Sequence, residues 1–595
     1  MNDPKLSIKT GGQWLVSKVG REPIFCREKF TQEQRQIDQM IREFARDQIF
    51  PNIDKINKFD KDLSLGIIKQ MGELGLLGID VPEELGGTNL DKISSTIVTE
   101  GVSTGGSPSF AATFGVQTGI GCLGIVFFGT PHQKEKYLPK LTSGDWIAAY
   151  ALTEPTSGSD ALSAKTNAVL SEDGKYYILN GEKQFVTNGN WATVFTVLAQ
   201  IDGNKFSAFI VEKGTEGFEI GKEEKKMGMK GSSTTSLKFT NAKVPIENLL
   251  YEPGKGAAIA FNALNIGRYK LAASCIGGCK LGIELVIKYA LERKQFGQAI
   301  AHFDSIRSKI ADMTVKLYAS DSMLYRTVGM IQDAIGDLDE SDPDYYMQTG
   351  KTMERFAVES SMAKVYGSET SDFFVDQFLQ VLGGYGFIEE YPAAGAYRDD
   401  RINRIWEGTN EINRAIITGY MMKKVLMEKI LLRNFLKDLD EYIITNSSTD
   451  KSELLGREIQ ALESAKRLAA LVFQESLCEF GQELKHEQQL GESLADIFTY
   501  IYTAGSVVSR SKTAVENNGK SDIPITIARI FCADALLNII LLVNRCLNKI
   551  FNESIPDRIS VPAKQLEEHM TLETDTISLK QELAEYMYAQ RSYPF

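Results

Sequence analysis

A single glutamate in the last third of the chain has the sequence surroundings expected of a general base. Glu407 stands between Trp406 and Gly408, at the end of the charged run Arg398-Asp-Asp-Arg-Ile-Asn-Arg-Ile-Trp-Glu-Gly-Thr409. An aromatic neighbour can shield a carboxylate from water, and such shielding raises its pKa and makes it a stronger base. The alternative is a surface or capping glutamate ahead of a helix that starts near Thr409. Taken alone, that alternative is favoured, because groups with perturbed pKa values are a minority.

Three other segments have residue types suited to binding phosphate. The run Tyr150-Ala-Leu-Thr-Glu-Pro-Thr-Ser-Gly-Ser-Asp160 offers hydroxyl groups and backbone N–H donors, and Gly158 lets a ligand approach the backbone closely. Arg293-Lys-Gln-Phe-Gly297 ends a helical pattern with two cations, which suit a pyrophosphate. Gln380-Val-Leu-Gly-Gly-Tyr-Gly386 exposes backbone after a long helix. Read separately, each also fits a structural role, namely a turn, charge at a helix C-terminus and a helix cap.

A glycine motif between residues 119 and 124 has the wrong context for a nucleotide site. Gly119-Ile-Gly-Cys-Leu-Gly124 matches G-x-G-x-x-G, but no strand precedes it and both flanks are helical in pattern. We interpret Gly119, Gly121 and Gly124 as positions of close helix packing that also line an open pocket.

The elements that position these groups follow the order α, β, α, with a further α segment. A capping box at Thr31 and Gln34 opens a helical region that runs to about residue 145. A β region of roughly a hundred residues follows, and Asn180-Gly181 predicts a hairpin turn between two of its strands. From Gly256 the helical pattern returns and continues to the C-terminus. The lack of βαβ alternation disfavours a doubly wound dinucleotide fold.

Composition excludes several classes of function. The chain has 595 residues and a net charge of −12, so a broad basic surface for nucleic acid is not expected. Its seven cysteines are scattered, and no histidine lies near Cys275 and Cys279, which predicts buried, reduced thiols and no metal site. No signal peptide is apparent, and the apolar stretch Ala535–Val543 is too short to span a bilayer. We therefore expect a cytoplasmic protein.

Together, the motifs resemble those of the acyl-CoA dehydrogenase family. The segment Tyr150–Asp160 is similar to the family's flavin-loop signature, and Arg398–Thr409 is similar to its second signature. Asn180–Gly189, Arg293–Gly297 and Gln380–Gly386 match in the same order, and the resemblance covers roughly residues 30 to 425. It implies a mainly α fold with a central β-barrel-like domain and a C-terminal four-helix bundle.

The resemblance implies an FAD-dependent enzyme that introduces a trans-2 double bond into a fatty acyl-CoA. Glu407 would remove the α-proton while the β-hydrogen leaves as hydride to the flavin. Electrons would pass to an electron-transfer flavoprotein in fatty acid β-oxidation. Two alternatives stay open: an acyl-CoA oxidase that uses oxygen, and a non-catalytic scaffold. The intact Glu407, Arg268 and flavin loop count against the scaffold.

The resemblance also assigns site residues by position. The implied cofactor-binding residues are Tyr150, Leu152, Thr153, Gly158, Ser159, Phe185, Thr187, Arg293, Gln295, Phe296, Gln380, Gly383, Gly384, Thr409 and Asn410. The implied substrate-binding residues are Ser159, Asn265, Arg268, Trp406 and Gly408. Gln380, Gly383 and Gly384 would meet the FAD of a neighbouring subunit.

The expected division of the chain has five parts. They are an N-terminal arm (1–30), a helical domain (31–148), a β domain (149–255), a four-helix bundle (256–425) and an α-helical extension (426–595). The extension resembles that of the very-long-chain branch, whose members form dimers and associate with membranes, and it favours long acyl chains. We expect a homodimer. Peripheral membrane contact is the weaker hypothesis, because the segment lacks a strongly basic face.

Overall fold

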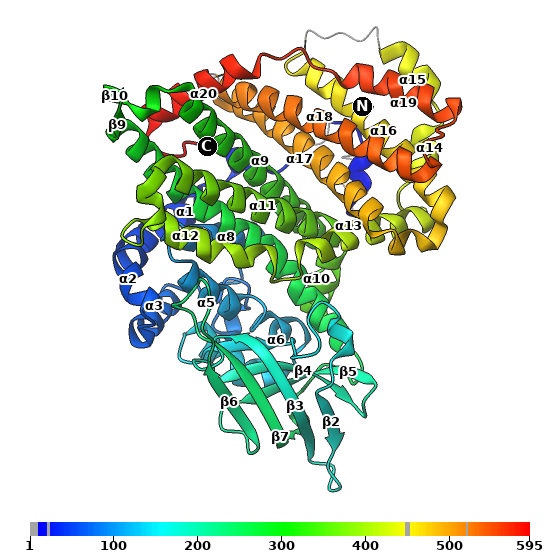
Figure 1. Cartoon of the computed structure of the whole chain (residues 1–595). Coiled ribbons are helices and arrows are strands. Elements are labelled where there is room, and N and C mark those ends of the chain that lie inside the picture. Colours follow the sequence, from blue (N-terminus) through cyan, green and yellow to red (C-terminus); the bar gives the residue numbers. More distant parts are fainter. Residues whose placement is uncertain (1–9, 21–23, 447–452, 519–521) are drawn as a thin grey trace.

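The computed structural model describes residues 10–20, 24–446, 453–518 and 522–595. A β-sheet forms one end of the molecule, the long bundle helices its middle, and the C-terminal helices the other end (Figure 1). The predicted fold class is confirmed, since a central sheet separates two helical regions and a helical extension follows.

The first helical region packs beside the sheet and against the bundle. Its helices are α1 (Gln32–Phe44), α2 (Ile53–Asn57), α3 (Lys61–Glu73), α4 (Lys92–Ser103), α5 (Pro108–Thr118), α6 (Leu123–Phe128) and α7 (Pro131–Thr142). The capping box at Thr31 and Gln34 is present, with both reciprocal hydrogen bonds. Beyond α1 the chain passes through a π-turn and a 3₁₀ turn that contains Pro51, so proline interrupts the helix as expected.

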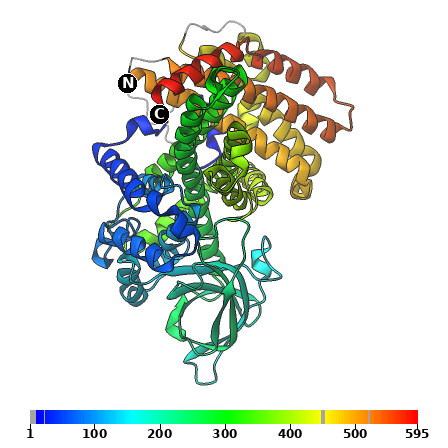
Figure 2. The same cartoon turned by 60° about the vertical axis from the view of Figure 1, so that its left-hand side comes forward.

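The sheet curls strongly but does not close (Figure 2). Its strands are β1 (Ala148–Ala151), β2 (Asn167–Leu170), β3 (Tyr176–Thr187), β4 (Val194–Ile201), β5 (Lys205–Glu212), β6 (Phe218–Glu223), β7 (Thr234–Pro245) and β8 (Leu249–Leu250). The hydrogen-bonded order is β6-β7-β3-β2-β4-β5-β8, and β1 pairs with β4 off this path. The expected barrel-like domain is therefore an open, curled sheet.

The predicted hairpin at Asn180-Gly181 is wrong. Both residues lie inside β3, which continues past them with a bulge opposite β7. Gly181 has φ of 148°, and a Cβ there would stand 2.7 Å from the Thr166 Cα. Asn180 pairs instead with Asn241, whose N–H donates to the Asn180 Oδ1 at 2.8 Å. Glycine here permits close backbone approach within a strand and does not form a turn.

Long helices make up the bundle. They are α8 (Gly256–Glu292), α9 (Asp304–Ile335), α10 (Tyr345–Glu354), α11 (Ala357–Leu382), α12 (Pro392–Asp400) and α13 (Asn410–Leu426). A short hairpin, β9 (Lys294–Gln295) and β10 (Gln298–Ala299), follows α8. Helices α8 and α11 bury residues on nearly every side, as central helices of a large core do. The acidic segment 337–344 is a loop with mostly exposed side chains, as predicted.

The extension packs on the bundle mainly through α17 and α20. Its helices are α14 (Leu432–Leu436), α15 (Leu439–Asn446), α16 (Gly456–Phe480), α17 (Gln488–Asn518), α18 (Ile523–Phe551), α19 (Asp557–Met570) and α20 (Thr576–Gln590). The N-terminal arm joins bundle and extension: the Trp14 indole donates to Glu359 of α11 at 2.8 Å, and its ring lies 5.1 Å from that of Tyr502 in α17.

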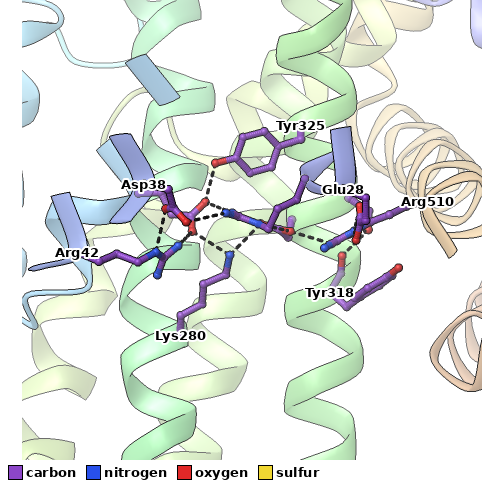
Figure 3. Close-up of polar contacts among 11 residues, drawn as sticks. Glu28, Asp38, Arg42, Lys280, Tyr318, Tyr325 and Arg510 are labelled. Atoms are coloured by element: carbon purple, nitrogen blue, oxygen red, sulfur yellow. Dashed lines mark hydrogen bonds and ion pairs between the residues drawn. The ribbon is translucent and has the colours of Figure 1, made fainter. Parts of the chain in front are cut away.

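A buried charge cluster ties these parts together (Figure 3). Its members come from the arm, α1, α4, α8, α9 and α17, and are Arg27, Glu28, Asp38, Arg42, Glu100, Lys280, Asp321 and Arg510. Asp321 accepts from Arg27 at 2.8 Å, from Lys280 at 3.1 Å and from Arg510 at 2.7 Å. Burial alone would raise the pKa of Glu100, but Arg27, Lys280 and Arg42 outweigh burial and lower it to about 2.

Two segments are long and apolar enough to cross a membrane by length and composition alone. They are Pro108–Phe128 and Ile523–Phe551, with 78% and 50% of their most apolar windows buried inside the protein. The stretch Ala535–Val543 thus belongs to a much longer apolar helix, which the sequence argument on length did not take into account. All seven cysteines are free, and Cys478 is exposed, whereas the sequence predicted buried thiols throughout.

Candidate active site

A cavity of about 720 Å³ opens between the first helical region, the sheet and the bundle. Its walls include Glu407, Trp406 and Thr187, together with residues of α4, α5, α11 and α12. Along α8 the lining residues recur every three or four positions from Gly267 to Leu285. At ~1.5 Å of rise per residue, this face of α8 follows the cavity for about 27 Å.

Glu407 occupies a tight turn, residues 406–409, which we call the Glu407 turn. Glu407 has φ of 57° and Gly408 has φ of 80°, so two successive residues adopt the left-handed conformation. This conformation is unfavourable for a non-glycine residue and needs support from surrounding contacts. The carboxylate rests on α8 at Gly267, where an added Cβ would stand 2.6 Å from the Glu407 Oε2. Glycine at 267 therefore makes room for the carboxylate.

The surroundings of Glu407 give it the protonation behaviour of a base near neutral pH. Burial raises the pKa of Glu407 to about 7, and the positive charges of Arg268 and Lys364 limit that rise. Its Oε2 is buried and has no hydrogen-bond partner among the described residues. A carboxylate held this way is ionised in part at neutral pH and has a lone pair free for a proton. This geometry supports the prediction of a shielded Glu407 over the surface alternative.

Arg268 connects α8 to the Glu407 turn. Its Nε lies 3.4 Å from the Glu407 carbonyl oxygen, and its NH1 donates to the Asn265 Oδ1 at 2.7 Å. Arg268 and Asn265, which the resemblance assigns together to substrate binding, thus contact each other directly. Burial lowers the pKa of Arg268, partly offset by the Glu407 charge.

Asn413 and Lys364, which sequence reasoning missed, hold the Glu407 turn by hydrogen bonds to its backbone carbonyl groups. The Asn413 Nδ2 donates to the Gly408 carbonyl at 2.8 Å and to the Thr409 carbonyl at 3.0 Å. Lys364 of α11 donates to the Gly408 carbonyl at 2.8 Å and to the Asn410 Oδ1 at 2.7 Å. The available signal for Lys364 was a lysine flanked on both sides by apolar residues, Met362-Ala363 and Val365-Tyr366, which indicates a buried charge with specific partners.

Thr409 and Asn410 begin α13. The Thr409 side chain caps that helix by accepting from the Ile412 N–H at 3.3 Å. The Asn410 Nδ2 donates to Ser368 at 3.1 Å and to Glu369 at 2.8 Å. Both polar atoms of the Asn410 side chain are therefore engaged inside the protein.

The predicted flavin loop begins in strand β1, where Tyr150 interacts electrostatically with Glu407. Tyr150 is buried, and its hydroxyl group has no partner among the described residues. Gly158 faces open space, and no described residue accepts a hydrogen bond from the N–H of Gly158 or Ser159. Phe185 has φ of 57° and a ring that is 64% exposed. Free N–H donors, a buried unpaired hydroxyl and an exposed aromatic ring fit a flavin nucleotide at this loop.

A buried ion pair missed by sequence reasoning fixes that loop to the sheet. Lys183 of β3 donates to the Glu154 Oε1 at 2.8 Å and to the Leu152 carbonyl at 3.1 Å. Glu154 also accepts from the backbone N–H groups of Lys165 and Thr166, at 2.5 and 3.0 Å. The Thr153 carbonyl accepts from the Gln184 N–H at 2.8 Å. The loop is therefore rigid although several of its residues are exposed.

The remaining predicted residues form a second group at the far end of α8. The Arg293 guanidinium lies 5.4 Å from the ring centroid of Tyr385, which belongs to the glycine-rich turn after α11. This contact brings the Arg293–Gly297 and Gln380–Gly386 segments together. Phe296 has φ of 51° and is 94% exposed. The group is far from Glu407, because 26 residues of α8 separate Gly267 from Arg293, or about 39 Å at ~1.5 Å each.

The glycine motif at 119–124 connects α5 to α6, and only part of it lines the cavity. Gly119 belongs to the wall. A Cβ at Gly121 would meet the Ala148 Cβ at 2.8 Å, and one at Gly124 would meet Ile259 at 3.3 Å. The expectation that all three glycines line the pocket is therefore wrong, since Gly121 and Gly124 serve close packing.

Family profiles of the acyl-CoA dehydrogenases match most of the chain. The N-terminal domain profile matches residues 31–145, the middle domain 149–242, and two C-terminal domain profiles match 254–422 and 464–558. A probable acyl-CoA dehydrogenase of Bacillus subtilis is 46% identical over 513 residues, or 86% of either chain. The human very long-chain specific acyl-CoA dehydrogenase is 36% identical over 420 residues, which are 68% of this chain and 60% of that protein.

Among solved structures, an acyl-CoA dehydrogenase of Bacillus anthracis complexed with FAD has a TM-score of 0.94 and 40% identity. The match covers 98% of this chain and all of that one, including the extension. The similarity therefore extends beyond the motifs to the whole architecture. The chain belongs to the acyl-CoA dehydrogenase family and is an FAD-dependent oxidoreductase.

Proposed function

We propose that this enzyme converts long-chain fatty acyl-CoA thioesters to trans-2-enoyl-CoA in the first step of fatty acid β-oxidation. The observation that carries the proposal is Glu407, a shielded carboxylate with a pKa near 7 in the wall of a long cavity. A thioester α-proton is weakly acidic, so its removal requires a base that is ionised near neutral pH and charge stabilisation at the carbonyl oxygen.

Glu407 is the catalytic base in this proposal. Its Oε2, which has no partner among the described residues, accepts the α-proton. The backbone N–H of Glu407 donates to the thioester carbonyl oxygen as charge develops there. Arg268, Asn265, Trp406, Gly408 and Ser159 orient the acyl-CoA. Bound FAD supplies the acceptor for the β-hydrogen, which leaves as a hydride.

Two sets of residues would hold FAD. Near the cavity they are Tyr150, Leu152, Thr153, Gly158, Ser159, Phe185, Thr187, Thr409 and Asn410. At the far end of α8 they are Arg293, Gln295, Phe296, Gln380, Gly383 and Gly384. The roughly 39 Å between Gly267 and Arg293 along α8 is farther than one FAD reaches. The second set therefore serves the FAD of a neighbouring subunit, and we propose a homodimer with these surfaces in contact.

The length of the cavity supports a preference for long acyl chains. A tetrahedral carbon chain with bonds of ~1.5 Å advances roughly 1.3 Å per bond, so about 27 Å along α8 leaves room for a long chain beside the flavin. Gly278 faces open space in this wall, whereas Gly282 allows the Phe374 ring to pack close to α8. The very long-chain specific enzyme among the relatives adds support.

An electron-transfer flavoprotein is the proposed electron acceptor, and the cytoplasm the proposed location. The five-part division of the chain given above is proposed on the same basis. Peripheral membrane contact remains the weaker hypothesis; Leu537 and Leu541 of α18 are its candidate contacts, since their side chains are 63% and 52% exposed. Flotation with liposomes tests it, and protein left at the bottom of the gradient would reject it.

Anaerobic titration of the FAD-loaded enzyme with acyl-CoAs of graded length tests the proposal. We expect the flavin absorbance to bleach with long chains and much less with short ones. Bleaching with short chains alone would reject the chain-length preference, and no bleaching with any acyl-CoA would reject the function. Admitting oxygen and measuring peroxide then separates a dehydrogenase from an oxidase.

A further inference from the structure

A buried lysine behind the Glu407 turn lies outside every motif that identified the site. Lys364 is in the middle of α11, has no exposed surface, and donates to the Gly408 carbonyl and the Asn410 side chain. We propose that Lys364 is the positioning residue of the base: its ammonium group holds the Glu407 turn and sets the electrostatic field at the carboxylate. The proposal rests on the assignment of Glu407 as the base.

The hydrogen bonds of the turn show why Lys364 matters for its shape. The Glu407 carbonyl has only long contacts, 3.4 Å from both the Arg268 Nε and the Asn413 Nδ2. The Gly408 carbonyl has two short ones, both 2.8 Å, from Lys364 and from Asn413. The turn is thus anchored at Gly408, and Lys364 provides half of that anchor. Two left-handed residues in succession relax unless such contacts hold them.

Few charged groups lie around the Glu407 carboxylate, so each of them has a large share in setting its pKa. Arg268 of α8 and Lys364 of α11 are the cations that act on Glu407, and the hydroxyl of Tyr150 faces it from β1. Lys364 in turn faces Cys275 of α8 and Glu369 of α11. Burial lowers the pKa of Lys364 to about 8, against the opposing effects of Cys275 and Glu407. Lys364 therefore loses its positive charge near pH 8, whereas an arginine such as Arg268 stays charged.

This arrangement has a measurable consequence. A nearby cation favours the ionised form of a carboxylate, so Lys364 keeps the Glu407 pKa from rising further. Without that charge, less of the base is ionised at any given pH below its pKa. The acid limb of the kcat/KM profile, which reports the free enzyme, must then move to higher pH.

Lys364→Met tests both functions of the side chain, since methionine keeps its length and loses its charge and donors. We expect the acid limb of kcat/KM to move up by about one pH unit, and the rate on that limb to fall roughly tenfold. The matched control is Lys424→Met. Lys424 is also buried and donates to two backbone carbonyls, those of Gly11 and Arg355 at 2.7 Å each, but away from the Glu407 turn. Its loss should leave the profile in place.

Lys364→Arg keeps the result decisive if the methionine variant does not fold. Arginine retains charge and donors, so the acid limb should stay at the wild-type position. The wild-type profile should have a second inflection near pH 8, where Lys364 loses its proton, and this inflection should disappear in Lys364→Arg because arginine keeps its proton. An acid limb unmoved in Lys364→Met, or a pH 8 inflection retained in Lys364→Arg, would overturn the proposal. A wrong base assignment shows up separately, as Glu407→Gln enzyme that still bleaches at the wild-type rate.

Discussion

The pKa of Glu407 makes a prediction about stability as well as activity. The ordinary pKa of a glutamate is 4.5, and in the folded protein burial raises that of Glu407 to about 7. Between these values the folded state holds a proton that the unfolded chain has released. Stability therefore falls as pH rises through this window, because the unfolded state binds fewer protons. At ~1.4 kcal/mol per pH unit, the loss approaches about 3 kcal/mol above pH 7.

Glu407→Gln removes this titration while keeping the shape of the side chain. At about pH 4 the wild-type carboxyl is protonated, so both proteins should be similarly stable. At about pH 8 the variant should be more stable by up to ~3 kcal/mol, and its thermal midpoint higher by a few degrees. The same variant should lose flavin bleaching by acyl-CoA almost completely. The gain in stability and the loss of function would then have one physical origin, the ionised Glu407 carboxylate in a buried site that disfavours its charge.

Thermal melts of the FAD-loaded proteins across this pH range are the assay. Asp400→Asn is the matched control: Asp400 also lines the cavity, and burial raises its pKa to about 6. The stability difference of Asp400→Asn should develop between about pH 4 and pH 6 and then stay constant up to pH 8, and this variant should keep its activity. If the excess stability of Glu407→Gln were the same at pH 4 and pH 8, or if the variant were the less stable protein at pH 8, the desolvated-base reasoning would be refuted.

Three further predictions concern positions that the structure singles out. Gly267→Ala places a Cβ 2.6 Å from the Glu407 Oε2, so kcat/KM should fall by about a hundredfold; Gly419→Ala, in α13 and facing open space outside the cavity lining, should be nearly silent in the same kinetic assay. Arg510→Met removes a buried partner of Asp321 and Glu28, so the free energy of unfolding in denaturant should fall by ~3–5 kcal/mol. In Arg558→Met, at an exposed ion pair, it should fall by under ~1 kcal/mol. Equal losses in the two variants would contradict a stabilising role of the buried charge cluster. Phe296→Ser should shift sedimentation toward monomer, and Ile577→Ser, at another exposed position in the extension, should not; a dimer retained by Phe296→Ser would reject that contact surface.

The family resemblance singles out Glu407 in the sequence, because the local pattern taken alone favours a surface or capping glutamate. The residues around Glu407 could not be predicted even from that resemblance. Gly267 and Lys364 come from different helices, and each is a common residue type in an ordinary helical pattern. Their importance arises only when α8 and α11 place them against the Glu407 turn. A motif in the sequence therefore marks a candidate reacting group more readily than the residues that position it.

The error at Asn180-Gly181 has the opposite cause, a strong local signal overruled by tertiary contacts. Asn-Gly favours a two-residue turn when nothing else competes. Here the Asn180 side chain pairs with Asn241 across to β7, and Gly181 admits the backbone of Thr166. The same residue types that make a turn in isolation also permit a bulge in a continuous strand. Only the register of the neighbouring strands distinguishes the two.

The extension contacts the helix that follows the Glu407 turn, so it bears on the candidate site as well as on the fold. Helix α13 begins with the Thr409 cap, immediately after the Glu407 turn. From α17, Asp496 accepts from Arg414 of α13 at 2.7 Å, and the Gly491 carbonyl accepts from Thr418 at 2.7 Å. These bonds fix α13 to the extension, while Lys364 and Asn413 hold the Glu407 turn just before its first residue. A helix restrained at both places can hold two left-handed residues ahead of its start, so the extension contributes to the rigidity of the site although none of its described residues lines the cavity.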